Sequence, residues 1–165
     1  MESWKQSLAR LSAERLASLK RQAFLLCGDD QQADDLVQDA LVRAFARSLR
    51  ASRPDATDAY LRKIMVNLFI DQTRRQSRWH RSAPLLADEE NIQDPAEEIV
   101  TRGVVRAALD DLSPRQRACI VLRYYQDLPV AQVAAALGVA EGTAKRYLSE
   151  AMTKMAARLS PVQDR

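Results

Sequence analysis

The sequence predicts an all-α protein of two small helical domains, joined by an extended acidic linker, with a helix-turn-helix in the second domain. Glycine is rare, with 4 residues in a chain of 165, and alternating runs of β-branched residues are absent. Apolar side chains make up 47% of the chain and recur at the spacing of amphipathic helices. No apolar run approaches the length of a membrane span, and residues 1–20 lack the apolar segment of a signal peptide. We therefore expect a cytoplasmic protein without membrane insertion.

Charge is unevenly distributed, although the net charge is only +3. Residues 1–81 carry 15 basic and 10 acidic side chains. Residues 82–98 carry 6 acidic side chains and no basic ones, and residues 99–165 carry 10 basic and 6 acidic side chains. Basic blocks that flank an acidic segment favour a polyanionic partner, although so small an excess also fits an ordinary solvated surface. With the helical pattern, this distribution predicts domains at residues 1–81 and 98–165 and a linker at residues 82–97.

Three helices are expected in the first domain. Stripes of apolar residues mark residues 7–26 and 31–49, and a glycine followed by two aspartates separates them. Residues 51–58 have the composition of a loop, and a third stripe marks residues 59–79.

The second of these helices begins with acids and ends with arginines. Its first turns carry Asp34, Asp35, Gln38 and Asp39. Acids at the start and bases at the end complement the helix dipole, which is one explanation of the polarity. A metal site is disfavoured because no second cluster of ligands accompanies these acids, so we expect a solvated or protein-binding face.

The third helix carries a polar face of another kind. Asn67, Asp71 and Arg74 recur at i, i+4 and i+7 on one exposed face, and Arg75 is adjacent. Between residues 43 and 81 there are ten basic residues and three acidic ones. This part of the chain is therefore the more plausible anion-binding surface.

The linker and the two helices after it are predicted from composition. Residues 82–97 contain two prolines around a run of acids and have no helical stripe, which predicts an extended segment. Apolar residues at helical spacing then predict a helix from about residue 95 to Leu112. Ser113 and Pro114 have the pattern of an N-cap and a first helical residue, so a further helix is expected at residues 115–125.

Two short helices close together form the predicted helix-turn-helix. The apolar residues of the first are Val130, Val133, Ala134 and Leu137, and Gly138 ends it. The apolar residues of the second are Ala144, Leu148, Ala151 and Met155. Its outward side chains suit phosphates and base edges in a major groove: Thr143, Lys145, Arg146 and Tyr147. The alternative is a pair of packed surface helices with solvated charges.

Motifs in both halves resemble one known family. In the second half, DLSPRQR at 111–117, LRYY at 122–125 and LGVAEGTAK at 137–145 resemble region 4 of bacterial sigma factors. The motifs that resemble region 2 are ADDLVQDALVRAF at 33–45, AYLRKIMVN at 59–67, Ile70-Asp71 and Arg74-Arg75. The two groups stand in the family's order, and the short connection leaves no room for a region 3. The chain therefore resembles the two-domain, extracytoplasmic-function type of sigma factor.

This resemblance implies a dissociable subunit that directs RNA polymerase core to promoters and nucleates DNA melting. It implies docking on the clamp coiled coil of the polymerase through Asp35, Gln38 and Asp39, and a second contact with the flap. It implies recognition of the −10 element by Asn67, Asp71, Arg62, Lys63, Arg74 and Arg75, with residues 51–58 completing the base pocket. It implies recognition of the −35 element by Thr143, Lys145, Arg146 and Tyr147. The linker would thread the RNA exit path, and an anti-sigma factor is a further candidate partner.

The chain departs from the family pattern at two places. Tyr60 stands where a tryptophan is usual, and it keeps a large ring there. Residues 144–148 read AKRYL where many relatives have VKSRL, which moves the arginine by about 100° around the helix. The −35 sequence preference therefore does not transfer from relatives.

The chain offers little material for catalysis or metal binding. His80 is the only histidine, and Cys27 and Cys119 stand apart in apolar contexts. Buried thiols in a reducing compartment explain them better than a redox or metal site. We expect neither enzyme activity nor a cofactor. The alternative function is a stand-alone helix-turn-helix regulator, which would need neither the acidic helix nor the face of Asn67 and Asp71.

Overall fold

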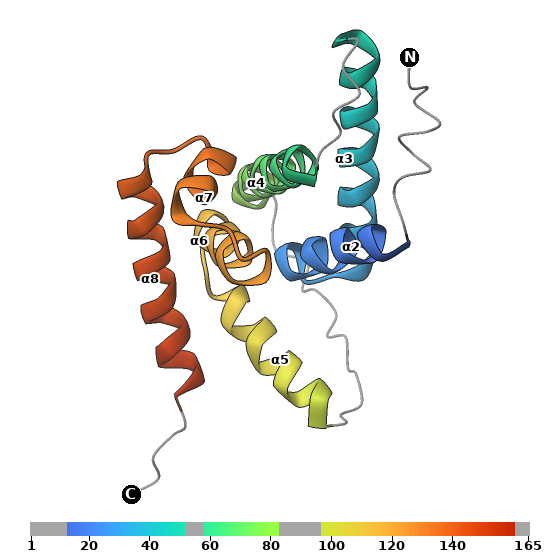
Figure 1. The fold of residues 1–165 in the computed structure, drawn as a ribbon. Coiled ribbons are helices and arrows are strands. Elements are labelled where there is room, and N and C mark those ends of the chain that lie inside the picture. The colour runs from blue at the N-terminus through green and yellow to red at the C-terminus, as the bar shows by residue number, and fades with distance from the viewer. Residues whose placement is uncertain (1–12, 52–57, 83–96, 161–165) are drawn as a thin grey trace, which may run out of the picture.

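The structure, a computed structural model, describes residues 13–51, 58–82 and 97–160, and its regular elements are all helical (Figure 1). The helices are α2 (Ala13–Cys27), α3 (Asp30–Ala51), α4 (Asp58–Ser82), α5 (Glu97–Asp110), α6 (Pro114–Ile120), the π-helical turn η1 (Val121–Tyr125), α7 (Val130–Leu137) and α8 (Glu141–Leu159). The all-α prediction is confirmed. No helix in these segments is long and apolar enough to cross a bilayer. The predicted loop and linker fall almost entirely outside the described residues, as does the predicted start of the first helix.

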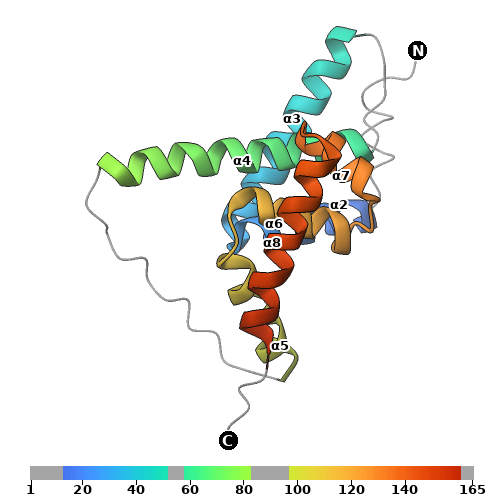
Figure 2. The same cartoon turned by 90° about the vertical axis from the view of Figure 1, so that its left-hand side faces the viewer.

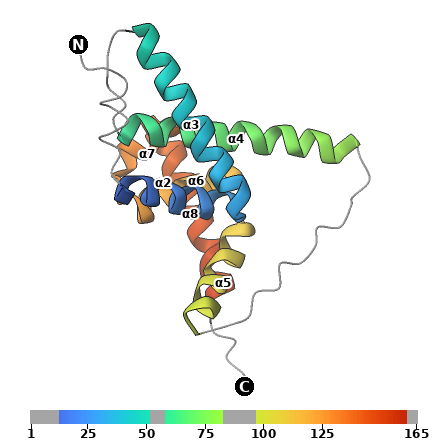
Figure 3. The same ribbon diagram turned by 90° about the vertical axis from the view of Figure 1, so that its right-hand side faces the viewer.

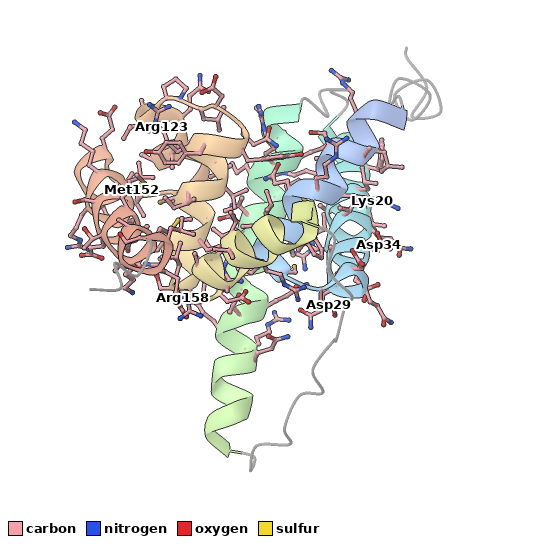
Figure 4. The ribbon with its side chains drawn as sticks, turned by 90° about the horizontal axis from the view of Figure 1, so that it is seen from below. Lys20, Asp29, Asp34, Arg123, Met152 and Arg158 are labelled. Carbon is pink, nitrogen blue, oxygen red and sulfur yellow. The ribbon has the colours of Figure 1, made fainter. Side chains whose placement is uncertain are left out.

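Helices α2, α3 and α4 pack together because each buries one apolar stripe. The buried apolar side chains are Leu19, Ala23 and Leu26 of α2, Ala33, Leu36, Val37, Ala40 and Ala44 of α3, and Leu61, Met65, Val66, Leu68, Phe69 and Ile70 of α4. Gly28 makes the turn between α2 and α3 with φ 72°, a conformation that residues with a Cβ rarely adopt. At the surface, Lys20 Nζ and Asp34 Oδ1 lie 3.4 Å apart and join the same two helices (Figure 4).

Local signals set the ends of the C-terminal helices. The Ser113 hydroxyl accepts from the backbone N–H of Gln116, and the Gln116 amide oxygen accepts from the N–H of Ser113, which is a capping box. Gly138 ends α7 in the left-handed conformation, with φ 66° and ψ 34°. Both helix ends were predicted from sequence, and both are confirmed.

The two halves of the chain pack directly against each other, which the sequence did not predict. Helix α4 contacts α6 and α7, and α2 contacts α6 and η1, so one hydrophobic core runs through both halves. Figures 2 and 3 show α4 lying across the molecule, with one end beside α7 and the other projecting clear of the remaining helices. This closed arrangement, meaning the contact of α2 and α4 with α6, η1 and α7, determines which polar faces stay accessible.

Candidate nucleic-acid interface

A hollow of about 270 Å³ lies between α3 and α4, on the face where Asn67 and Asp71 were predicted. Asn67 is half-buried in it and Asp71 is exposed at its edge. The hollow is also lined by Arg43, Arg47 and Tyr60, which the predicted set did not include. The Arg47 guanidinium lies 6.0 Å from the centroid of the Tyr60 ring. An amide, a carboxylate, a ring and two cations therefore surround one small space.

The other residues predicted for this site are divided between two places. Arg74 and Arg75 are exposed on α4. Arg62 is half-buried, and its Nη1 donates to the Gln126 side chain at 2.9 Å. Together with Lys63 it lines a separate space against Gln132 and neighbouring residues of α7. The structure thus brings Asn67 and Asp71 together but places Arg62 and Lys63 at the contact between the two halves.

The acidic face of α3 forms a compact exposed patch. Asp35, Gln38 and Asp39 are all exposed, as predicted from their spacing. Val42 follows one turn later and is 62% exposed, which is high for a large apolar side chain. An apolar group beside three polar ones is a pattern suited to binding another protein surface. Val42 stands four residues after Gln38, and this spacing predicts that it shares the exposed face. Sequence reasoning missed it because apolar residues on an amphipathic helix are assigned to the core by default.

The outward face of α8 presents the predicted DNA-binding side chains. Lys145 and Arg146 are exposed, whereas Thr143 and Tyr147 are half-buried. The Arg146 guanidinium lies 5.5 Å from the centroid of the Tyr147 ring, and its Nε lies 3.9 Å from Glu150 Oε1. Because both contacts lie along the surface of α8, Arg146 stays within reach of a docked duplex.

A polar network fixes α8 relative to α6. Gln116 is buried, and its Nε2 donates to Glu150 Oε2 at 3.0 Å. Its Oε1 also accepts from Lys154 Nζ at 3.0 Å. Buried polar groups that are satisfied in this way hold an element in one orientation. The network therefore holds α8, the second helix of the helix-turn-helix, against α6.

Neither thiol has the properties of a reactive cysteine. Burial raises the pKa of Cys27 to about 11, against the opposing effect of the nearby Arg117 cation. Burial also raises the pKa of Cys119 to about 12. Both groups are protonated at neutral pH, and a protonated thiol is a poor nucleophile and metal ligand. Among the described residues, no group of three or more His, Cys, Asp and Glu side chains could hold a metal ion.

The sequence matches two family descriptions. Residues 12–78 match sigma-70 region 2, and residues 102–155 match sigma-70 region 4. An RNA polymerase sigma-E factor of Streptomyces avermitilis is 33% identical over 141 residues, covering 86% of this chain and 78% of that protein. The extracytoplasmic-function sigma factor SigM of Mycobacterium tuberculosis is 36% identical over 139 residues, covering 84% and 69%.

Solved structures share the whole fold. The sigma factor RpoE of Bartonella quintana, in complex with the anti-sigma factor NepR, is similar with a TM-score of 0.72. It is 28% identical, and the similarity covers 98% of both chains. CnrH, in complex with the cytosolic domain of CnrY, has a TM-score of 0.65 at 23% identity, covering 94% of this chain and 88% of that one. The two family matches, over residues 12–78 and 102–155, lie in the N-terminal and C-terminal halves of this fold.

Proposed function

This chain belongs to the sigma-70 family of transcription initiation factors, to its extracytoplasmic-function type, and on this premise we propose that three separate surfaces bring RNA polymerase core to a promoter. The region 2 match over residues 12–78 disfavours a stand-alone helix-turn-helix regulator, which would need only α7 and α8 to bind DNA. In this role the protein acts in the cytoplasm, positions the polymerase and catalyses nothing itself.

The first surface is the α3 patch, which binds RNA polymerase core at the clamp coiled coil. Its support is the exposure of Asp35, Gln38 and Asp39 on one side of a helix whose other side is buried. Val42 adds an apolar contact at the end of the patch. Burial of one apolar side chain within a ring of polar ones is a common source of binding energy at protein interfaces.

The second surface is the hollow between α3 and α4, which accepts a base unstacked from the −10 element. This hollow is the observation that carries the proposal, because its five polar or aromatic side chains match the parts of a nucleotide. The Tyr60 ring offers a stacking surface, and Arg43 and Arg47 offer cations for the adjoining phosphates. The Asn67 amide can both donate and accept at a base edge, and the Asp71 carboxylate can accept from an exocyclic amine. Unstacking a base costs a few kcal/mol, which these contacts offset.

The third surface is the outward face of α8, which reads the −35 element as a recognition helix in the major groove. Its support is the exposure of Lys145 and Arg146 on a helix fixed to α6 through Gln116. An arginine can bind guanine with two hydrogen bonds, whereas a lysine at the flank is better placed for phosphate.

An anti-sigma factor is the remaining partner that we infer. The support is a relative, because the RpoE structure that covers 98% of this chain contains the anti-sigma factor NepR. A protein of this kind would control how much free sigma subunit reaches the polymerase.

In vitro transcription tests the proposal. The purified chain, added to core polymerase of its own bacterium and a library of genomic DNA fragments, should yield transcripts that start at a shared promoter motif. A variant with both Asp35 and Asp39 changed to Lys should yield far fewer transcripts, because the charge of its docking patch is reversed. A stand-alone regulator would bind fragments in the same library but would produce no transcripts with core alone, and that outcome would overturn the proposal.

A further inference from the structure

Glu150 is an acidic side chain on the face of α8 that we propose for the −35 element. The helix carries four basic residues and two acidic ones, Glu141 and Glu150. Residues four apart in sequence are only about 40° apart around a helix, so Glu150 lies on the same side of α8 as Arg146. A carboxylate there repels the phosphates of a docked duplex and weakens binding to DNA of any sequence. Affinity alone therefore does not explain an acid on this face.

A buried glutamine of α6 fixes the Glu150 carboxylate. Gln116 is 6% exposed, and its Nε2 donates to Glu150 Oε2 at 3.0 Å. The orientation of that amide is set at its oxygen, which accepts from the Ser113 N–H at 3.1 Å and from Lys154 Nζ at 3.0 Å. Because two donors bind the oxygen, the amide nitrogen is directed at Glu150. The carboxylate is therefore held in place before any DNA binds.

The second oxygen of Glu150 faces Arg146. Glu150 Oε1 lies 3.9 Å from Arg146 Nε, and the centroid of the Tyr147 ring lies 5.5 Å from the guanidinium. The guanidinium is thus restrained along one edge by a carboxylate and on one face by a ring. An arginine has five N–H donors, and restraint at Nε leaves the four on its two terminal nitrogens for other partners. Those two nitrogens form a fork that can bind guanine O6 and N7 together.

The contact differs from an ordinary surface ion pair. Exposed pairs at i and i+4 contribute little to stability, because both side chains lose freedom when they meet. Arg146 is 65% exposed and Glu150 is 49% exposed, so this pair also adds little to stability. Glu150, however, is already ordered by its hydrogen bond to Gln116. What the contact changes is the direction in which the Arg146 fork points.

Restraint of Arg146 affects which group of the DNA it binds. A free arginine on a recognition helix can bind either a base edge or a phosphate, and a phosphate contact carries no sequence information. The negative charge of Glu150 beside the guanidinium lowers its attraction to phosphate. Two hydrogen bonds to guanine depend on orientation instead, which the restraint supplies in advance. Glu150 therefore lowers affinity for DNA in general and raises the preference for one base pair.

We propose that Glu150 is a positioning residue that sets base preference in the −35 element by directing Arg146, and that α6 takes part through Gln116. The inference rests on the proposed role of α8 as the recognition helix. Glu150 needs no contact with a base of its own, since it acts through the orientation of Arg146.

The test compares Glu150→Ala with the wild type, with Arg146→Ala and with the double variant, all as full-length chains. The matched control is Glu141→Ala, which removes the same charge from an exposed position at the start of α8. Three probes are used: the duplex that the wild type selects from a randomised −35 library, the same duplex with the base pair assigned to Arg146 replaced, and a scrambled duplex of equal length. Circular dichroism and thermal unfolding verify that each variant is folded.

Glu150→Ala should bind the scrambled duplex about threefold more tightly than the wild type, because one negative charge is removed. Its preference for the selected duplex over the replaced one should fall about tenfold, because the Arg146 fork is no longer directed. Glu141→Ala should show the first effect and keep the full preference. In the Arg146→Ala background, Glu150→Ala should leave the preference at that base pair unchanged, since there is no arginine to direct.

Equal weakening by Glu150→Ala on all three duplexes would overturn the proposal, because it would show that Glu150 only holds α8 against α6. A loss of preference that persists in the Arg146→Ala background would also overturn it and would assign Glu150 to a base directly. If Arg146→Ala keeps the full preference, the proposed base contact of Arg146 fails and the role of Glu150 fails with it. If Arg146→Ala loses the preference while Glu150→Ala keeps it, the base contact of Arg146 stands and only the role of Glu150 fails.

Discussion

Arg115 Nη1 lies 3.3 Å from the hydroxyl oxygen of Tyr147, so a side chain of α6 holds the ring that stands beside Arg146 on α8. The same ring lies under the Arg146 guanidinium. Tyr147 is therefore held from two sides and half-buried, whereas Arg146 extends into solvent. This arrangement favours Arg146 as the group that reaches base edges and Tyr147 as its support.

Arg146→Ala should cost about 1–3 kcal/mol of binding to the best −35 sequence and relax the preference at one base pair, because a bidentate contact to guanine is lost. Selection from a randomised −35 library with each variant measures both effects. The comparison variant is Tyr147→Ala. If Arg146→Ala leaves the selected motif unchanged while Tyr147→Ala shifts it, the roles of the two residues are reversed.

Lys145→Ala should weaken binding by a similar factor on every −35 sequence, since a phosphate contact carries no sequence information. It should also reduce the slope of log affinity against log salt by about one unit. Titrations of one duplex at several salt concentrations measure the slope. A changed sequence preference with an unchanged slope would assign Lys145 to a base instead.

Reversal of charge at both Asp35 and Asp39, to Lys, should weaken binding to core polymerase at least tenfold while leaving the melting temperature nearly unchanged, because exposed positions tolerate substitution. Binding to labelled core measures the effect. The control is Asp30→Lys with Asp34→Lys on the same helix, where Asp34 faces Lys20 of α2. Equal losses in the two variants would mean that net charge, and not the patch, governs docking.

Asn67→Ala should reduce open-complex formation much more on a duplex promoter than on a template already unpaired across the −10 element, because its proposed role is to capture an unstacked base. Permanganate reactivity of thymines reports the opening. Gln76→Ala provides a control, since it removes an exposed amide from the same helix outside the hollow. Equal losses on both templates would assign Asn67 to sequence reading after melting, and no loss would remove it from the site.

Gly138→Ala should lower the free energy of unfolding by about 1 kcal/mol, because the residue ends α7 at φ 66° and a Cβ is strained there. A Cβ at Gly138 would meet nothing within 4 Å, so backbone strain is the only cost. Gly103→Ala in α5 should stabilise instead, by up to about 1 kcal/mol, because that position is helical and equally open. Thermal unfolding measures the change in stability of each variant relative to the wild type. A change of the same sign in both variants would contradict the prediction.

Features that depend on neighbours in sequence could be predicted from sequence. The helices follow from the spacing of apolar residues, and the ends at Ser113 and Gly138 follow from capping chemistry that a few residues contain. The outward face of α8 follows from the buried stripe of Ala144, Leu148 and Ala151 on the same helix. These signals are local, so tertiary packing does not alter them.

Features that depend on distant segments could not be predicted. Arg43 and Arg47 belong beside Asn67 only because α3 crosses α4 there, and no pattern within either helix specifies that crossing. Gln22 is an amide that composition would assign to the surface, yet it is fully buried because Gln126, far along the chain, satisfies its oxygen. The contact of the two halves rests on several such pairs, which is why the sequence alone predicted separate domains.

The π-helical turn at Val121–Tyr125 has an evolutionary consequence. Its bond from the Gln126 N–H to the Val121 carbonyl, 3.1 Å long, encloses one more residue than an α-helical turn does. Removal of one residue there would restore an α-helical turn and rotate everything after it by about 100°. Gln126 would then face away from Gln22 and Arg62 with no side chain replaced. Within the family, deletion of one residue at this turn would therefore distinguish chains whose two halves are bound to each other at this contact from chains whose halves are not.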